Sequence, residues 1–380
     1  MNKNKGITLI ALVITIIILL ILSGISISAL TNQGLFKNAK AAQNATEKAE
    51  EEQGQRLNEY EDEINKYLNN ANEDEKIGLI TDNINKELNK TDNTKLKDEK
   101  GNRIVVPAGF KIINGATTVD KGIVIEDVTE TATKGSQFVW VPVGTITKAD
   151  GTTVTITLGR YDFNSTTGVE SAYSGTYVEE DSNDSSTLKK WGNTIAKNIT
   201  KFKNSVATNG GYYIGRYEAR TATARNAAGN ALTQITEKGT ENVYNYVTQL
   251  QAAQLSQNMY NSDKYTSDLI NSYAWDTATV FIQNCGTNTK YSIQNSLYTS
   301  LAQTGTNSLT DTSKIDVQCN IYDMASNIRE WTTETSSDSS NPCVYRGGIY
   351  DGNSSCTSDR YDYYTSRSTA DFGFRPLLYL

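Results

Sequence analysis

The stretch NIYDMASNIREWT, residues 320–332, carries the strongest fold signal in this chain of 380 residues. It is followed by YRGG at residues 345–348 and by FGFRP at residues 372–376. The paired glycines permit a tight turn or a close passage of two backbones. We therefore expect these three stretches to hold the C-terminal part of the fold together.

Several side chains in these stretches are of types that stabilise a fold. We predict that Met324 and Trp331 lie in the core. Glu330 is expected to form a buried charge pair with Arg375 or with Arg346, because a buried charge requires a partner. Such a pair would lock the ends of the domain together.

Working outward, the chain carries strand and helix patterns from about residue 100 onward. Short β-type runs separated by turn signals occur at residues 104–106, 122–125, 138–143 and 212–218. Residues 245–258 and 267–284 have the spacing and composition of helices. We therefore predict an α+β domain over residues 101–380.

Taken together, the three stretches resemble the signature of the formylglycine-generating-enzyme-like domain, a variant of the C-type lectin fold. In that family a motif N-x-Y-D-M-x-x-N-x-x-E-W is followed by R-G-G and then by G-F-R. The resemblance implies a C-type-lectin-like domain over residues 101–380. Family members also have calcium sites in this segment, where Asn327 and Glu330 offer the oxygen ligands that Ca²⁺ takes. A purely structural role is the alternative for both residues.

The resemblance does not extend to the enzymatic chemistry of the family. Its oxidases hold copper with two closely spaced cysteines between R-G-G and G-F-R, where this chain has only Cys356. Other relatives use His and Tyr with non-haem iron, and this chain contains no His. The lack of His also excludes Ser-His-Asp catalysis and His-ligated zinc. We expect a binding protein rather than an enzyme, with no cofactor other than calcium.

The chain has four cysteines, all toward its C-terminal end: Cys285, Cys319, Cys343 and Cys356. None forms a C-x-x-C pair, so a zinc ribbon or a thioredoxin-like motif is not indicated. In an extracellular setting they allow up to two disulfides, and Cys343 with Cys356 would close a short loop. Buried thiols are the alternative, and the sequence leaves the pairing open.

The interval between R-G-G and G-F-R, residues 349–371, has the composition of a recognition surface. It is dense in Tyr, Asp, Asn, Ser and Arg. Tyr supplies a large contact area at low entropic cost, and Ser and Asn supply adaptable hydrogen bonds. An ordinary polar loop would have a similar composition. The candidate ligand contacts are Tyr350, Asp351, Asn353, Asp359, Tyr361, Tyr363 and Tyr364.

The same interval is similar in position to the mutable segment of diversity-generating-retroelement variable proteins. Those proteins use this fold and carry their mutable residues just before the final G-F-R. Adenine-directed mutation of Asn codons yields Tyr, Asp, Ser, Thr and Asn, which is the mixture found at residues 349–371. The resemblance therefore implies that this interval is hypervariable.

The N-terminus indicates membrane attachment. No charged residue occurs between Gly6 and Phe36, and the apolar run over residues 7–30 is long enough for a membrane-spanning helix. Lys3 and Lys5 precede it, which keeps this end in the cytoplasm and the rest outside. The run is too long for a cleaved secretory signal peptide, whereas a plain membrane anchor fits its hydropathy.

The short leader and the sequence ITLI directly after it resemble the prepilin leader of type IV pilins and pseudopilins. In that family a prepilin peptidase cuts after the Gly, which implies cleavage between Gly6 and Ile7 and methylation of the new N-terminus. Pilins usually carry Glu at the fifth mature position, where this chain has Ala11. A minor, tip-located or membrane-held protein is therefore favoured over a core pilin subunit, with other pilins as partners.

Beyond the apolar run, the composition favours a continuing helix. From residue 39 the chain is rich in Ala, Glu, Gln and Lys, and apolar residues recur at helical spacing. The expected fold class is α+β, with a long N-terminal pilin-like helix followed by a C-type-lectin-like domain of the formylglycine-generating-enzyme type. The predicted order is a leader at residues 1–6, a transmembrane and stalk helix at 7–68, a linker at 69–100 and the domain at 101–380.

Charge narrows the choice of partners. The net charge is −7 and the basic residues are spread along the chain, so we expect no nucleic acid partner. The favoured function is a receptor or adhesin on the cell surface, membrane-anchored or pilus-associated, whose head binds an external protein or glycan. The alternatives are a structural minor pilin whose head caps or primes a filament and, less favoured, an oxidase of the formylglycine-generating type.

Overall fold

The computed structural model describes residues 13–15, 46, 78–80, 88, 91–113, 117–129, 131–179, 198–229, 234–295, 316–350 and 355–380. Contacts divide the chain into two compact units, Met1–Lys76 and Ile77–Leu380. The predicted leader with its cleavage site at Gly6 and Ile7, and almost all of the predicted stalk helix, lie outside the described residues. Of the first unit, only the short helical pieces at residues 13–15 and 46 are described.

The fold class predicted from the sequence is wrong. The described residues form mostly short strands in several small sheets, and the helices among them, such as α4 (Ile199–Asn209), are short. No long N-terminal helix is seen in the described part of the chain, and none of its helices has the length and hydropathy to span a bilayer. The prediction rested on motif resemblance and on local periodicity, and neither reveals the strand pairings that dominate here.

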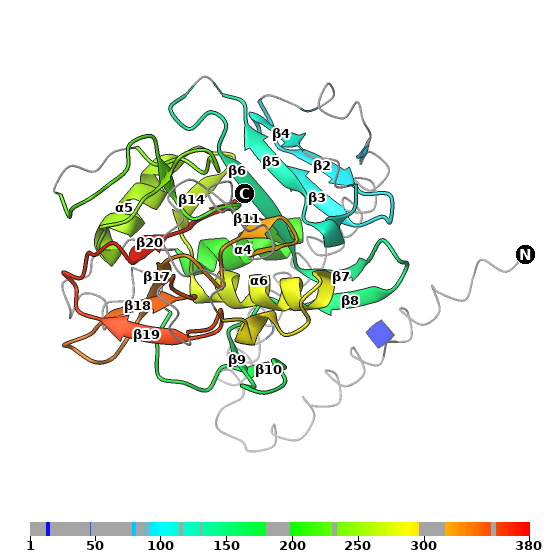
Figure 1. Ribbon diagram of the computed structural model, residues 1–380. Coiled ribbons are helices and arrows are strands. Elements are labelled where there is room, and N and C mark those ends of the chain that lie inside the picture. Colours follow the sequence, from blue (N-terminus) through cyan, green and yellow to red (C-terminus); the bar gives the residue numbers. More distant parts are fainter. Residues whose placement is uncertain are drawn as a thin grey trace, which may run out of the picture. The chain divides into compact units, whose positions relative to one another are not determined.

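The larger sheet of the Ile77–Leu380 unit has six strands, and each neighbouring pair is antiparallel. Figure 1 shows β5, β6 and β11 side by side in it. Side chains alternate between its faces, so Trp140 and Tyr213 join one buried cluster while Val141 and Tyr212 join the other. Both faces are therefore buried. The strand order is β14 (Thr266–Leu269), β21 (Pro376–Tyr379), β11 (Gly211–Gly215), β6 (Gln137–Pro142), β5 (Val124–Asp127) and β4 (Phe110–Ile113).

Two helices contribute to the two buried clusters. Helix α6 (Ser272–Cys285) supplies Trp275 and Phe281 to the cluster of Tyr212, and α5 (Gln249–Met259) supplies small and branched residues to the other. Each helix begins with a side-chain cap. Thr248 forms a capping box at α5, and Asn271 accepts a hydrogen bond from the first turn of α6.

The described residues also form five sheets of two or three strands and two short 3₁₀ helices. Two of these strands, β1 and β2, lie within the predicted linker at residues 69–100. Strand β2 buries Leu96 against the core. The smaller elements are β1 (Gly78–Leu79) with β2 (Thr94–Lys97) and β3 (Arg103–Val106), β7 (Gly144–Thr147) with β8 (Thr153–Ile156), β9 (Tyr161–Phe163) with β10 (Glu170–Ala172), β12 (Arg220–Thr221) with β13 (Asn242–Val243), β15 (Val317–Gln318) with β16 (Ile321–Tyr322), η1 (Val119–Lys121) and η3 (Tyr291–Ile293).

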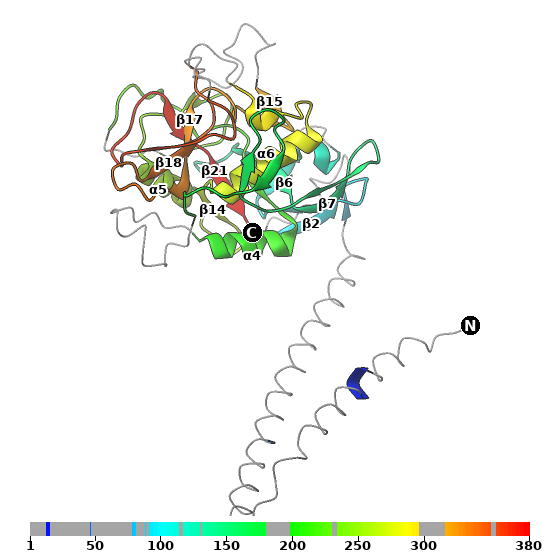
Figure 2. The same ribbon diagram turned by 90° about the horizontal axis from the view of Figure 1, so that it is seen from below.

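A four-stranded sheet is ordered β19 (Arg360–Tyr363), β18 (Cys343–Arg346), β17 (Arg329–Thr335) and β20 (Phe372–Phe374). Strand β18 pairs antiparallel with β17 and β19, whereas β20 runs parallel to β17. In both ribbon views this sheet lies on the opposite side of the unit from β7 (Figure 1, Figure 2).

Arg375 joins the two sheets, because it is the one residue between β20 and β21. Its side chain is fully buried and donates two hydrogen bonds to Glu330 of β17, at 2.6 Å from Nη2 and 3.1 Å from Nε. The predicted pairing of Glu330 with Arg375 is confirmed, and so are the core positions of Met324 and Trp331. The three C-terminal stretches therefore meet at the junction of the sheets.

Candidate functional site

Strands β18 and β19 place several tyrosines on one surface. The antiparallel register sets Tyr345 opposite Tyr361 and Cys343 opposite Tyr363, and opposed residues project to the same face of a sheet. The ring centroid of Tyr345 lies 5.7 Å from that of Tyr361 and 6.1 Å from that of Tyr363. Tyr364 follows directly, with its ring 5.3 Å from that of Tyr363. These four residues are referred to below as the tyrosine face.

The outer part of the tyrosine face is open to solvent. Tyr361 is 45% exposed and Tyr364 is 44% exposed, and they are the exposed aromatic side chains among the residues that the structure describes. Tyr345 is 6% exposed, and its ring lies beside the rings of Tyr361 and Tyr363. The face therefore combines two accessible rings with a fixed aromatic base.

Buried aromatic rings support the tyrosine face from below. Phe372 of β20 meets Tyr345 edge to face at 5.0 Å and Tyr363 at 5.8 Å. Phe372 in turn stacks on Trp331 of β17 at 4.5 Å. Such aromatic pairs contribute about 0.5–1.5 kcal/mol each beyond the area that they bury. The exposed tyrosines thus rest on a continuous aromatic layer.

Two arginines border this surface. The guanidinium of Arg329 lies 5.4 Å from the ring centroid of Tyr345 and forms an ion pair with Asp371 at 2.6 Å. The guanidinium of Arg367 lies 4.5 Å from the ring centroid of Tyr363 and 3.6 Å from the carboxylate of Asp371. Cation–π contacts of this kind orient both partners. The surface therefore presents aromatic rings beside two arginines that share the carboxylate of Asp371.

The opposite side of β18 and β19 carries buried charges. Arg346 and Arg360 are paired in the register, and both contact Asp276 of α6, with Arg346 at 2.6 Å. Arg360 also donates to Glu334 of β17 at 3.1 Å, and Glu334 pairs with Arg160 as well. Burial alone would lower the pKa of Arg360, but Asp276 and Glu334 raise it above its ordinary value. This buried charge network holds β19 against the rest of the unit.

The structure separates the residues that the sequence grouped as ligand contacts. Tyr361, Tyr363 and Tyr364 lie together on the tyrosine face, as described above. Asp359 lies beside Tyr361, whose pKa it raises through its charge and a side-chain hydrogen bond, and it also accepts a hydrogen bond from the backbone N–H of Cys356 at 2.7 Å. Tyr350 does not join this group in the described contacts: its backbone N–H donates to the carbonyl of Asn327 at 2.8 Å. The candidates Asp351 and Asn353 lie outside the described residues.

Three members of this surface were missed by sequence reasoning, namely Tyr345, Arg329 and Arg367. Tyr345 was interpreted only as part of the YRGG stretch, and the two arginines were not singled out. The alternation of Tyr361 and Tyr363 along β19 could have indicated that both lie on one face of a strand. Which residues of the neighbouring strand lie opposite them depends on the strand register, which the sequence does not show.

The two residues proposed for calcium have protein partners in the structure. Both oxygens of Glu330 accept hydrogen bonds from Arg375, and the side-chain amide of Asn327 donates to Glu218. Burial raises the pKa of Glu330, and Arg375 partly offsets this. No group of three or more Cys, Asp or Glu side chains in the described ranges has an arrangement that would hold a metal. Calcium at Asn327 and Glu330 stays a prediction.

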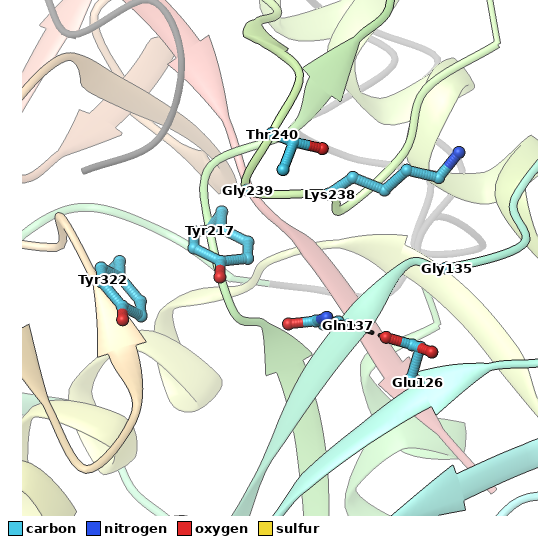
Figure 3. Close-up of a pocket in the computed structure, with 8 residues that line it drawn as sticks. All are labelled: Glu126, Gly135, Gln137, Tyr217, Lys238, Gly239, Thr240 and Tyr322. Carbon is cyan, nitrogen blue, oxygen red and sulfur yellow. Dashed lines mark hydrogen bonds between the residues drawn. The ribbon is translucent and has the colours of Figure 1, made fainter. Parts of the chain in front are cut away.

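A separate pocket lies beside the six-stranded sheet, with a volume of about 310 Å³ (Figure 3). Its polar side chains are held by one another. Arg216 donates to Gln137 at 2.8 Å, Gln137 donates to Glu126 at 2.9 Å, and Lys111 pairs with Glu126 at 3.1 Å. The pocket's aromatic side chains, Tyr217 and Tyr322, are less exposed than Tyr361 and Tyr364, so we take the tyrosine face as the candidate site. The pocket is lined by Glu126, Gly135, Gln137, Tyr217, Lys238, Gly239, Thr240 and Tyr322.

Comparisons with known proteins identify no family. No family model and no curated protein matches the chain. Among solved structures it is similar to Treponema denticola variable protein 1, with a TM-score of 0.32 and 13% identity over 66% of this chain and 98% of that one. It is also similar to CarF, with a TM-score of 0.28 and 16% identity over 36% of this chain and 67% of that one. Both likenesses are remote, and no functional argument rests on them.

Proposed function

We propose that this chain is a binding protein displayed on the cell surface, and that its tyrosine face contacts an external protein or glycan. The observation that supports this most is the pair of exposed rings, Tyr361 and Tyr364, on a fixed aromatic base. Tyrosine offers a large, partly polar contact area with few rotatable bonds, so it loses little conformational entropy on binding. The bordering arginines, Arg329 and Arg367, add hydrogen-bond donors for a ligand.

The support below the tyrosine face favours binding energetically. A binding surface that is already ordered avoids the cost of fixing side chains, about 0.5–1.5 kcal/mol for each mobile one. Here the aromatic layer lies under one side of β19 and the buried charge network lies under the other. Tyr345 and Tyr363 are therefore held in place before a ligand arrives.

We further propose that residues 349–371 are diversified by a retroelement, which would make this chain a variable protein. The exposure of the side chains on and next to β19 indicates which codons should vary. Tyr361 and Tyr364 face solvent and can change freely, whereas Arg360 is built into the charge network. A near-copy template at the locus should differ at adenines in the codons for the exposed tyrosines and should preserve the codon for Arg360. A locus without such a template would refute this part of the proposal.

Display on the cell surface is supported by the N-terminal sequence alone. The apolar run at residues 7–30 is proposed to attach the chain to the membrane, with a prepilin peptidase cutting between Gly6 and Ile7 and with other pilins as partners. Mass spectrometry of the protein from its native membrane tests this, because cleavage would leave a methylated Ile7 as the first residue. An intact Met1 on the membrane-bound protein would contradict the processing.

A binding screen tests the function itself. The full-length chain is applied to arrays of glycans and to intact cells, with and without Ca²⁺, because a calcium requirement at Asn327 and Glu330 is part of the proposal. The wild type should bind a subset of targets, and the variant Tyr361→Ser/Tyr363→Ser/Tyr364→Ser should not. Val169→Ser is the matched control, because Val169 is 61% exposed and lies on no strand of the four-stranded sheet.

A further inference from the structure

Cys285 and Cys319 are brought together by two elements that lie far apart in the sequence. Cys285 is the last residue of α6, and Cys319 follows β15 directly. Both are partly buried and pack against the same hydrophobic cluster, the one that contains Tyr212 and Trp275. The structure records both as thiols.

The residues next to the two cysteines are in direct contact. The backbone N–H of Thr287 donates to Oε1 of Gln318 at 2.8 Å. A Cβ atom placed on Gly286 would lie 3.5 Å from the Cβ of Gln318. The end of α6 and the end of β15, which carry Cys285 and Cys319, therefore lie side by side. The thiol of Cys285 is close enough to that of Cys319 to add to the rise of its pKa, after the larger effect of burial.

The backbone at Cys319 gives a second, independent indication. Cys319 and Asn320 have φ values of 48° and 63°, and together they form the two-residue turn between β15 and β16. Such turns favour Gly, Asn and Asp, because a larger side chain at positive φ is strained. The side chain of Asn320 clamps the turn by donating to the carbonyls of Lys121 and Gly122 at 2.9 and 2.7 Å. A cysteine held in this turn calls for a role that offsets the strain.

The pairing of Cys343 with Cys356, one of those that the sequence allowed, does not fit the register. Cys343 lies opposite Tyr363 at one end of the β18–β19 ladder, and Arg346 lies opposite Arg360 at the other. Three residues of strand span about 10 Å. Cys356 precedes Arg360 by a turn, in which its carbonyl accepts a hydrogen bond from the N–H of Asp359, and it is paired with Asn295 in an isolated β-bridge. The register therefore places Cys343 at the end of the ladder away from Arg360, the strand end nearest in sequence to Cys356, which disfavours a disulfide between them.

We propose that Cys285 and Cys319 form a disulfide that staples the C-terminal end of α6 to the β15–β16 turn. The two S–H bonds and the S–S bond of an acceptor disulfide, such as oxidised glutathione or a protein disulfide, break. One S–S bond forms between Cys285 and Cys319, and two electrons and two protons pass to the acceptor, which leaves as two thiols. Cys343 and Cys356 retain their thiols.

The environment of the two thiols determines when this bond can form. Burial raises the pKa of Cys285 to about 12, with Asp120 adding to the effect, and burial also raises the pKa of Cys319. Thiol–disulfide exchange requires a thiolate, which is scarce at neutral pH when the pKa is this high. We therefore expect the bond to form while the chain folds, before burial raises the pKa of the two thiols.

The staple would act on the junction of the two large sheets. The turn leads into β16, where the carbonyl of Tyr322 accepts a hydrogen bond from Nη2 of Arg375 at 2.8 Å. The backbone N–H of Tyr322 donates to Arg216 at 2.9 Å, next to strand β11. Fixing the turn would thus help to hold the Arg375–Glu330 pair, on which the base of the tyrosine face rests.

Thiol counting tests the proposal directly. The full-length chain is refolded from denaturant in reduced and oxidised glutathione, and refolding is verified by near-ultraviolet circular dichroism. It is then alkylated in denaturant without reductant. The intact mass should show two alkylated sites, and a proteolytic digest should contain one cross-linked peptide pair carrying Cys285 and Cys319. Four alkylated sites, or a link that includes Cys343 or Cys356, would overturn the proposal.

Serine variants give a second, independent measurement. Cys285→Ser and Cys319→Ser should each show three alkylated sites and should lower the midpoint of thermal unfolding by similar amounts, roughly 5–10 °C for a loop of this length. The midpoint of thermal unfolding of the double variant should be no lower than that of either single variant. Cys356→Ser should keep the link and show one alkylated site. Additive losses in the double variant would mean that the two cysteines act separately, which contradicts the staple.

Discussion

At the scale of single residues, the ion pair of Glu330 with Arg375 links the four-stranded and the six-stranded sheet. Both side chains are fully buried, and Arg375 also donates to the carbonyl of Gly215 at 3.0 Å. Removing one partner of a buried pair leaves an uncompensated charge in the core, which costs about 3–5 kcal/mol. The pair therefore couples β17 to the crossing between the sheets.

The substitution Arg375→Met should lower the free energy of unfolding by about 3–5 kcal/mol, measured by urea denaturation. The matched control is Lys111→Met, which removes a pair with Glu126 in which the lysine side chain is 40% exposed. An exposed pair contributes less than about 1 kcal/mol. Equal losses in the two variants would show that Arg375 has no special role.

The buried carboxyl of Asp316 predicts that the free energy of unfolding depends on pH. Burial raises the pKa of its carboxyl from 3.8 to about 7, and the neighbouring Asp323 adds to the effect. The folded state therefore holds a proton that the unfolded state releases. The stability that this proton contributes is fully present below pH 3.8 and is lost as the pH rises through about 7.

Unfolding by urea at a series of pH values between about 4 and 7 measures this contribution. Asp316→Asn cannot titrate, so its stability should fall less steeply with rising pH than that of the wild type. Asp150→Asn is the control, because Asp150 is fully exposed and hydrogen bonds from Thr152 lower the pKa of its carboxyl. Parallel profiles for the wild type and Asp316→Asn would contradict the assignment.

Residue roles could be predicted from the sequence where the chemistry is local. Trp331 and Met324 are apolar side chains in a dense motif, and Glu330 had few candidate partners. Tyr345 and Arg367 could not be predicted, because they reach the tyrosine face only through the register of β18 and β19. A shift of one residue would have turned Tyr345 to the opposite face.

At the scale of elements, the glycine pair before residue 349 sets how closely two segments pass. A Cβ atom on Gly348 would lie 1.9 Å from the carbonyl oxygen of Ala325, and one on Gly347 would lie 2.8 Å from that of Met324. Both contacts are with backbone atoms, so relieving them would require one of the two segments to shift. The YRGG stretch thus packs directly against the loop that precedes β17.

Gly348→Ala should therefore separate these segments and destabilise the protein by several kcal/mol, seen as a fall in the thermal unfolding midpoint. Gly229→Ala is the control, because a Cβ there meets nothing within 4 Å and its φ is not in the left-handed region. The packing argument fails if Gly348→Ala unfolds at the same temperature as the control variant.

Element types could be predicted in part. The predicted strand at residues 138–143 corresponds to β6 (Gln137–Pro142), because its apolar residues are buried on both faces. The predicted helix at residues 267–284 begins too early, since residues up to Leu269 form β14 and pair with β21. That pairing joins segments more than one hundred residues apart, and local composition does not reveal it.

At the scale of the whole molecule, the six-stranded and the four-stranded sheet have different roles. The six-stranded sheet is buried on both faces and supplies stability, whereas the four-stranded sheet has one side facing the charge network and one side carrying the tyrosine face. The long N-terminal helix and the C-type-lectin class predicted from sequence resemblance did not describe this arrangement. Motif spacing identified which segments meet, but it did not determine how the strands are ordered.

The most direct test of the central claim is the affinity of single tyrosine variants for a ligand found in the binding screen, measured by titration calorimetry on the full-length chain. Tyr361→Ala and Tyr364→Ala should each weaken binding by at least about tenfold, as expected for aromatic contacts at the centre of an interface. Val169→Ser should bind like the wild type. Unchanged affinity in both tyrosine variants would contradict the claim that the tyrosine face is the binding surface.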